Sequence, residues 1–310
     1  MATSGDFIWE ELLTSNTAAA ATFYSKVAGL KTAPSTVDES YITFASSAGP
    51  MGGLMTLPDD AKKTGARPTW MSYISTENVE ETSRHAESLG GKVLKPPADV
   101  GDGGRFAVLQ DPQGASFMIY ASSHPLEPAT TVPLGGIYWH ELITTDYKAA
   151  FTFYQQLFGW TIASDMKMGD TGVYRIFGTP TMPKGAGGIY NKPPQQPGPP
   201  VWLPYIHVAS VEKAADVAKS IGAKILHGPA DVPGGRIVMG ADPQGAMFAL
   251  HALVGSTTAP KPKPKPKAKA AHAKRTKKKI AAKKKASPKR KTSPKKKTAK
   301  KAKRRAGSKK

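Results

Sequence analysis

The sequence predicts an α+β protein with two similar domains, each built from two βαβββ units, followed by a disordered basic tail. Three observations support this prediction. The chain repeats itself at an offset of 130 residues, each repeat alternates strand-like segments with amphipathic helices, and the basic residues gather at the C-terminus.

The internal repeat is clearest near the start of each copy. The segment FIWEELLTSNTAAAATFYSKVAGL begins at Phe7 and matches IYWHELITTDYKAAFTFYQQLFGW, which begins at Ile137. Later, DPQGASF at Asp111 matches DPQGAMF at Asp242. A repeat of this length predicts two homologous domains. We expect a first domain at 6–121, a linker rich in Pro, Ser and Thr at 122–135, and a second domain at 136–253.

Each domain also splits into two similar halves, because a strand followed by an amphipathic helix occurs twice within it. In the first helix of the first domain, the apolar residues Ala20, Phe23, Tyr24 and Val27 recur at the spacing of one helix face. Short β-type runs broken by Gly and Pro follow each helix, for example at 105–109. Each half is therefore expected to form one βαβββ unit.

Charge and composition narrow the class of protein. Residues 260–310 carry 26 of the 44 Lys and Arg residues and none of the 23 Asp and Glu residues. The remaining 18 basic and 23 acidic residues give the body the balance of an ordinary globular protein. The absence of cysteine excludes disulfides and thiol catalysis. Because we find neither a signal peptide nor an apolar run of membrane-spanning length, we expect a cytosolic chain that does not bind membranes.

The phrases FYxxxxG and DPQGAxF, placed in a doubled βαβββ pattern, resemble the vicinal oxygen chelate superfamily. That is the fold of glyoxalase I, the bleomycin-resistance proteins and the extradiol dioxygenases. The resemblance covers residues 7–252, and the doubled arrangement is similar to the two-domain glyoxalase-like proteins of bacteria. It implies the fold but not one activity, since a single fold supports many chemistries.

Enzymes of this superfamily hold a divalent metal with His, Gln or Glu side chains from the first and last strands of each unit. Alignment on the Phe-Tyr pair and on DPQG places apolar or aromatic residues at these positions, among them Trp9, Trp139, Met71, Leu203, Met118 and Ala249. None is a normal ligand for a divalent cation. The sequence therefore predicts no metal or other cofactor, with a divalent metal at a displaced site as the alternative.

Strand side chains alternate between faces, so residues two positions from these ligand positions also point into the presumed cavity. In the second domain they are Glu141, His207 and His251. These three are either a displaced catalytic site of a lyase or oxygenase, or separate hydrogen-bonded residues of a pocket. The ligand-binding residues that we expect in the two cavities are Trp9, Glu11, Tyr73, Tyr120, Trp139 and Tyr205.

Three further residues permit two interpretations each. His140 lies one position from a metal-ligand position, but its neighbours Tyr138 and Leu142 are expected to face the helices. Arg105 and Arg236 follow Gly-rich hairpin turns. We expect structural ion pairs there, with an anionic ligand at the cavity mouth as the alternative.

The C-terminal segment is expected to be disordered and to bind DNA. It begins PKPKPKPK, which disfavours helix, and it contains SPKR at Ser287 and SPKK at Ser293. Such repeats in a Lys, Ala and Pro background resemble the tails of linker histone H1 and of H1-like bacterial proteins. This implies binding to phosphates without sequence preference and a nucleoid location, or a nuclear one in a eukaryotic host. The expected contacts are Lys277, Lys278, Lys279, Lys283, Lys284, Lys285, Lys289, Arg290, Lys291, Lys295, Lys296, Lys297, Arg304 and Arg305.

Three hypotheses about function follow. The body binds a small apolar or aromatic ligand and the tail tethers it to DNA, or the body is a glyoxalase-like lyase or oxygenase, or the body is a scaffold for the tail. The sequence does not identify the ligand, the oligomeric state, or whether Ser287 and Ser293 are phosphorylated.

Overall fold

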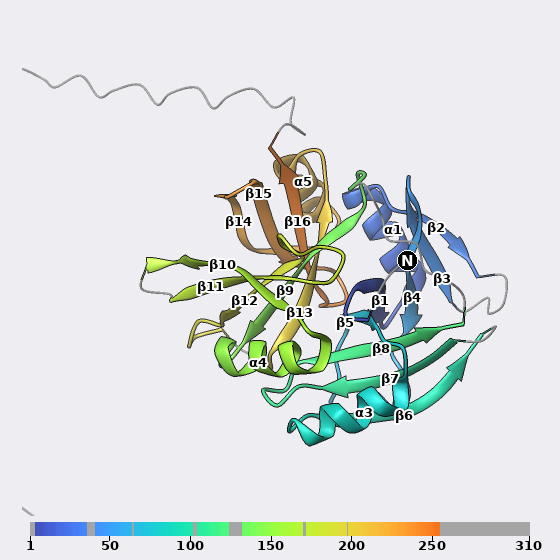
Figure 1. Cartoon of the computed structure of the whole chain (residues 1–310). Coiled ribbons are helices and arrows are strands. Elements are labelled where there is room, and N and C mark those ends of the chain that lie inside the picture. The colour runs from blue at the N-terminus through green and yellow to red at the C-terminus, as the bar shows by residue number, and fades with distance from the viewer. Residues whose placement is uncertain are drawn as a thin grey trace, which may run out of the picture. The chain divides into compact units, whose positions relative to one another are not determined.

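The computed structural model describes residues 4–35, 41–63, 65–101, 104–123, 132–169, 172–196 and 198–254 (Figure 1). We call residues 4–123 lobe 1 and residues 132–254 lobe 2. The expected tail at 260–310 lies outside the described residues.

Lobe 1 is a sheet of eight strands with three helices. The strand order is β2-β3-β4-β1-β5-β8-β7-β6, with β1 and β5 antiparallel at the centre. Its elements are β1 (Phe7–Thr14), α1 (Thr17–Ala28), β2 (Lys31–Pro34), β3 (Ile42–Ser46), β4 (Gly49–Thr56), α2 (Asp59–Lys63), β5 (Thr69–Ser75), α3 (Val79–Ser88), β6 (Lys92–Val100), β7 (Gly104–Gln110) and β8 (Ser116–Ser122).

Lobe 2 repeats this sheet in the order β10-β11-β12-β9-β13-β16-β15-β14. Its elements are β9 (Ile137–Thr144), α4 (Tyr147–Phe158), β10 (Thr161–Lys167), β11 (Val173–Gly178), β12 (Gly187–Asn191), β13 (Val201–His207), α5 (Val211–Ser220), β14 (Lys224–Val232), β15 (Gly235–Ala241) and β16 (Met247–Leu253). The predicted tandem of paired βαβββ units is thus confirmed.

The first helix of each lobe begins and ends with the same local signals. The side chains of Asn16 and Asp146 accept backbone N–H groups at the N-termini of α1 and α4. Gly29 and Gly159 end these helices in the left-handed conformation, which glycine adopts without a steric penalty.

The long helices connect the lobes, because each packs into a core shared by both sheets. Helix α1 of lobe 1 lies beside α5 of lobe 2, and α4 of lobe 2 lies beside α3 of lobe 1 (Figure 1). One apolar cluster joins Phe23 and Trp70 to Phe248, and a second joins Phe117 to Phe153 and Trp202. Neither lobe therefore completes its helix-side core alone.

The two phrases that repeat in the sequence meet across this junction. The Tyr24 hydroxyl donates to Asp242 over 3.1 Å, and the Tyr154 hydroxyl donates to Asp111 over 3.1 Å. In each case the helix of one lobe binds the DPQG turn of the other. Burial raises the pKa of both aspartates, with partial compensation by these hydrogen bonds.

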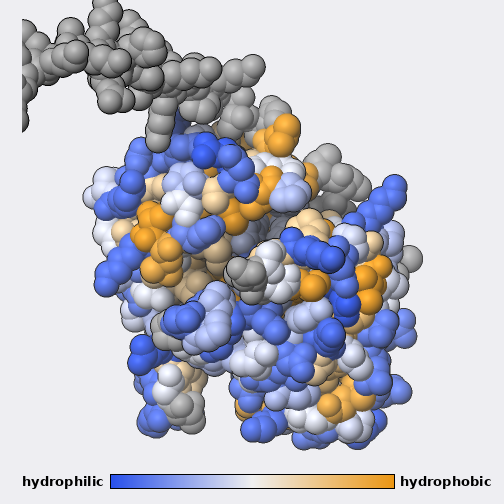
Figure 2. All heavy atoms as spheres, turned by 90° about the vertical axis from the view of Figure 1, so that its left-hand side faces the viewer, coloured by the Kyte–Doolittle hydropathy of each residue, from blue (hydrophilic) through white to orange (hydrophobic). Residues whose placement is uncertain are grey.

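The surface is mainly hydrophilic with small hydrophobic groups, as Figure 2 shows for the side of the molecule at the left of Figure 1. Ile162 on β10 and Leu226 on β14 are among the exposed large apolar residues. In the part of the chain that the structure describes, no helix combines the length and apolar character of a membrane span.

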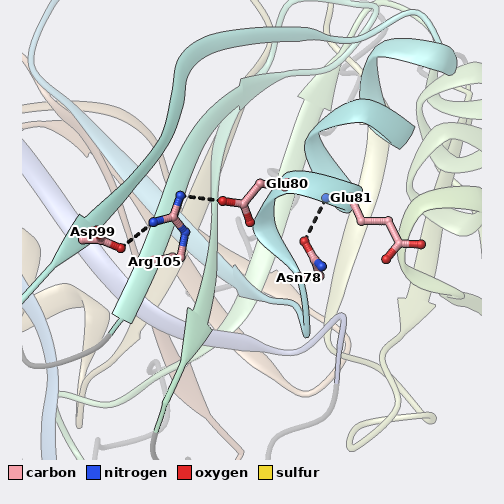
Figure 3. A network of polar contacts seen from close by, with 5 residues as sticks. All are labelled: Asn78, Glu80, Glu81, Asp99 and Arg105. Carbon is pink, nitrogen blue, oxygen red and sulfur yellow. Dashed lines mark hydrogen bonds and ion pairs between the residues drawn. The ribbon is translucent and has the colours of Figure 1, made fainter.

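The two arginines that follow the Gly-rich turns form structural ion pairs, as expected. Arg105 contacts Glu80 at the start of α3 and Asp99 on β6, so it ties a helix to a hairpin (Figure 3). Arg236 repeats the arrangement in lobe 2 with Glu212 and Asp231. These arginines are already neutralised by two carboxylates each.

Candidate functional site

Each sheet has a second face, opposite the long helices, which we call the site face. Register places the expected residues of lobe 1 there together, since Trp9 pairs with Tyr73 and Tyr73 pairs with Met118. In lobe 2, Trp139 pairs with Tyr205, and Tyr205 pairs with Ala249. Small apolar clusters surround these residues on both site faces.

A carboxyl group lies at the centre of the lobe 2 site face. Glu141 is buried, with only 5% of its surface exposed. Its Oε2 accepts a hydrogen bond of 2.9 Å from Tyr174, and its Oε1 accepts one of 3.0 Å from Tyr205. Trp139 Nε1 donates to the Tyr174 hydroxyl over 2.9 Å, which completes a chain from indole to phenol to carboxyl.

The environment of Glu141 changes its acidity. Burial raises the pKa of its carboxyl group to about 7, because a charge is costly away from water. Hydrogen bonds from Tyr174, Tyr205 and Tyr190 act in the opposite direction and lower it in part. The group therefore exchanges its proton near neutral pH, the range in which a general acid or base is most effective.

Lobe 1 contains the same arrangement around Glu11. Its Oε2 accepts from Tyr41 over 3.1 Å and from Tyr73 over 3.3 Å, and Trp9 Nε1 donates to Tyr41 over 3.1 Å. Burial raises the pKa of Glu11, while the two tyrosines and the positive charge of Lys95 lower it. Tyr120 lies at the edge of this group, with its ring 6.3 Å from that of Tyr73.

Two glycines make room for the tyrosines that reach each carboxyl group. A Cβ atom on Gly188 would lie 2.0 Å from Tyr174 Cζ, and one on Gly53 would lie 1.9 Å from the Tyr41 hydroxyl. Both distances are far inside van der Waals contact, so only glycine allows the ring to cross β12 or β4.

The lobes differ in the cation next to the carboxyl group. Lys95 stands at the fourth position of β6, opposite Val108 on the site face, with its ammonium 4.6 Å from the centre of the Phe106 ring. The fourth position of β14 is His227, opposite Met239. A histidine, unlike a lysine, is not a permanent cation at neutral pH.

The three residues of the displaced catalytic hypothesis have separate partners. Glu141 is held by tyrosines, whereas His251 Nδ1 is bonded to the Tyr138 hydroxyl. His207 Nδ1 donates to the carbonyl oxygen of Val132 over 3.0 Å. The two histidines are register neighbours on β13 and β16. Burial lowers the pKa of His251, and the neighbouring His207 lowers it further.

The position of Tyr138 corrects an expectation from the sequence. Strict alternation predicts that it faces the helices, but the β9–β13 register shifts between Tyr205 and Ile206. This irregularity turns Tyr138 toward the site face, where its ring stacks on His251 at 5.7 Å. Local departures of this kind re-aim a side chain and have no simple sequence signal.

His140 lies on the helix side, at the junction of the lobes. Its Nε2 is 2.7 Å from Glu10 Oε1, and its ring stacks on Phe7 at 3.6 Å. Glu10 also accepts a 2.7 Å hydrogen bond from Ser72. Since Glu10 and His140 occupy the same position in the two repeats, this contact joins equivalent strands and is structural.

The donor chemistry of the site faces does not fit a divalent metal. The described residues contain no group of three His, Cys, Asp or Glu side chains that could hold one. The family's ligand positions carry indole, thioether or methyl groups at Trp139, Met118 and Ala249, which are poor ligands for such a cation. In the described part of the chain, the residues at these positions therefore do not fit a divalent metal.

Sequence reasoning missed Tyr41, Tyr174 and Tyr190 as parts of the candidate sites. A signal was present for the first two, since each stands three residues before a buried Phe of the same strand region and faces a Gly-Gly pair in the next strand. Recognising that a glycine pair seats aromatic rings on both of its faces would have located them.

Comparison with known proteins identifies the family. The profile of the Glyoxalase/Bleomycin resistance protein/Dioxygenase superfamily matches residues 8–119 and 136–250. The chain belongs to this superfamily and contains its domain in two tandem copies.

Relatives include CFP32 of Mycobacterium tuberculosis (strain CDC 1551 / Oshkosh), which carries a glyoxylase name. It is 28% identical over 246 residues, which cover 78% of this chain and 92% of CFP32. DauV of Streptomyces sp. (strain C5), an anthracycline biosynthesis protein, is 30% identical over 190 residues, which cover 60% of this chain and 66% of DauV.

Solved structures share the fold. The 2,3-dioxygenase LapB from Pseudomonas sp. KL28 has a TM-score of 0.55 at 12% identity, covering 81% of this chain and 93% of LapB. The Mn(II)-bound glyoxalase from Novosphingobium aromaticivorans has a TM-score of 0.55 at 17% identity, covering 81% of this chain and 83% of the glyoxalase. At these identities the likeness concerns the fold alone.

Proposed function

We propose that the body binds a small apolar or aromatic ligand on its site faces without using a metal, and that the C-terminal tail tethers it to DNA. The observation that carries the first half is the pair of buried carboxyl groups, Glu11 and Glu141, each held by tyrosines beside apolar residues at the family's ligand positions. Apolar walls with a few placed polar groups are typical of small-molecule sites.

Ligand binding is tested by titrating the purified chain with a panel of small aromatic compounds and following tryptophan fluorescence. We expect saturable changes that shrink in Trp139→Phe or Trp9→Phe, because those indoles touch the tyrosines of the sites. Metal analysis of chain purified without chelator is the control. Stoichiometric metal that is lost in Glu141→Ala, or an unresponsive panel, would contradict the proposal.

Charge in the tail supports DNA tethering. The 26 basic residues of 260–310 have no acidic neighbours in that segment, and lysine-rich chains of this kind bind phosphates by releasing counterions. With about ten phosphate contacts, the slope of log K against log salt is about −9. The proposed location is the cytoplasm, associated with the nucleoid.

A gel-shift comparison of the full chain with one ending at Ala259 tests the tether. We expect the full chain to bind unrelated duplexes equally at low salt and to release them at high salt. A shortened chain that bound as well, or binding unaffected by salt, would refute the tether.

One observation favours a second function. Because the pKa of Glu141 is raised to about 7, it suits proton abstraction in a glyoxalase-like lyase. Turnover of a thiol-methylglyoxal adduct that disappears in Glu141→Gln would support the enzyme hypothesis. If the parent chain and Glu141→Gln both showed only the background rate, the ligand-binding hypothesis would stand.

A further inference from the structure

We infer that the lobe 2 site selects ligands that carry a protonated amine beside an aromatic or apolar group, whereas the lobe 1 site does not. This inference rests on the proposed ligand-binding function and specifies its ligand class. It follows from the different surroundings of Glu141 and Glu11.

The groups that contact Glu141 are neutral. Tyr174, Tyr190 and Tyr205 supply hydroxyl groups, and these stabilise a carboxylate without cancelling its charge. The ring centre of His251 is 6.5 Å from that of Tyr205, which donates to Glu141. Burial and His207 both lower the pKa of His251, so it stays uncharged near neutral pH. A buried carboxylate without a counter-charge is unfavourable, so a ligand that supplies one gains affinity.

In lobe 1, a residue of the protein itself supplies the positive charge next to the carboxyl group. Lys95 acts on Glu11 electrostatically and lies over the Phe106 ring. A cationic ligand would meet the repulsion of this ammonium. His227 stands at the matching position of lobe 2, so the permanent positive charge of a lysine is missing from that position.

The aromatic rings of lobe 2 favour the same ligand class. The rings of Tyr174 and Tyr190 stack with their centres 5.6 Å apart, and the indole of Trp139 is bonded to Tyr174. Aromatic rings near a carboxylate attract a cation through their faces and also pack against an apolar body. Ammonium recognition commonly combines these two elements.

Three probes of similar shape test the inference by calorimetry at pH 8, namely phenethylamine, phenethyl alcohol and 3-phenylpropionate. We expect the amine to bind at least about tenfold more tightly than the alcohol, as a charge-assisted hydrogen bond provides, and the carboxylate to bind most weakly. Glu141→Gln should remove the preference for the amine.

Two charge-matched variants isolate the cause. His227→Lys installs the lobe 1 arrangement in lobe 2 and should abolish the amine preference. Leu226→Lys adds the same charge one residue earlier, at an exposed side chain, and should preserve it. Both positions are exposed, so both variants are expected to fold.

The outcomes separate this inference from the proposed function. Equal binding of amine and alcohol by a chain that binds the aromatic panel overturns the inference alone. An amine preference that survives His227→Lys overturns it as well. No binding of any probe or panel compound overturns both.

Discussion

The two faces of each sheet differ in what varies between the repeats. On the helix-covered faces the pairs Tyr24–Asp242 and Tyr154–Asp111 are kept, while buried apolar residues change in size, as from Leu30 to Trp160. On the site faces the carboxyl groups and two tyrosines of each site match, but Tyr190 of lobe 2 is replaced by Met55 in lobe 1, and Lys95 is replaced by His227 in lobe 2.

We interpret this difference as the effect of packing on the helix-covered faces and of ligand selection on the site faces. The helix-covered faces form a junction in which a change in one lobe alters the packing of the other, so the size of each apolar residue there has to suit both lobes. The site faces lie on the opposite side of each sheet from this junction, and they differ in charge.

The largest effect is expected from a cavity in the shared core. Phe153 of lobe 2 is 3% exposed and packs edge-on against Phe117 of lobe 1 at 6.2 Å. Phe153→Ala should lower the free energy of unfolding by about 3–5 kcal/mol and increase hydrogen exchange in β7 and β8 of the other lobe. Val217→Ala, at the outer side of α5, is the control. Separate unfolding of the lobes would contradict a shared core.

The second effect concerns pH. The pKa of Glu141 is about 7 in the folded chain, whereas the ordinary pKa of a glutamate, which applies in the unfolded chain, is 4.5. Between these values the folded state binds the proton and the unfolded state does not, so stability falls as pH rises from 4.5 to 7. The loss amounts to about 3 kcal/mol.

Denaturant titrations at pH 5 and pH 8 measure this loss. Glu141→Gln cannot ionise and should lose correspondingly less stability between the two pH values. Identical pH profiles for the variant and the parent chain would rule out a buried, titrating Glu141.

A smaller effect is expected at the glycine that seats Tyr174. Gly188→Ala should displace the ring, remove a hydrogen bond from Glu141 and cost about 1–3 kcal/mol of stability. Tyr174→Phe retains the ring and loses only the hydroxyl with its hydrogen bonds to Glu141 and from Trp139, so it should cost about 1 kcal/mol per bond. If Gly188→Ala were no worse than Tyr174→Phe, the close approach would have no energetic importance. Thermal unfolding distinguishes the two.

The smallest effect is expected at the surface ion pairs. Arg105→Ala removes contacts to Glu80 and Asp99, all of which are substantially exposed. The cost should be below about 1 kcal/mol and should vanish in high salt. A larger, salt-independent loss would give Arg105 a role beyond the ion pairs.

The sequence was sufficient to predict the fold, because the repeat, the helix periodicity and the turn residues agreed. Strand alternation also placed Glu11, Glu141 and their aromatic neighbours on one face. It could not show that Tyr41 and Tyr174 cross a neighbouring strand to reach them, since this depends on contacts between strands. It also failed at Tyr138, where the register shifts, and it could not foresee that Glu10 and His140 would meet.

Glu141 of lobe 2 is a buried carboxyl group whose described side-chain partners are tyrosines and include no cation. Carbon-13 NMR of glutamate-labelled chain, with Glu141→Gln used for assignment, measures this group directly. We predict a titration midpoint of about 7 for Glu141, which falls in His227→Lys as a cation is added. A midpoint near 4.5, unchanged by His227→Lys, would contradict the account.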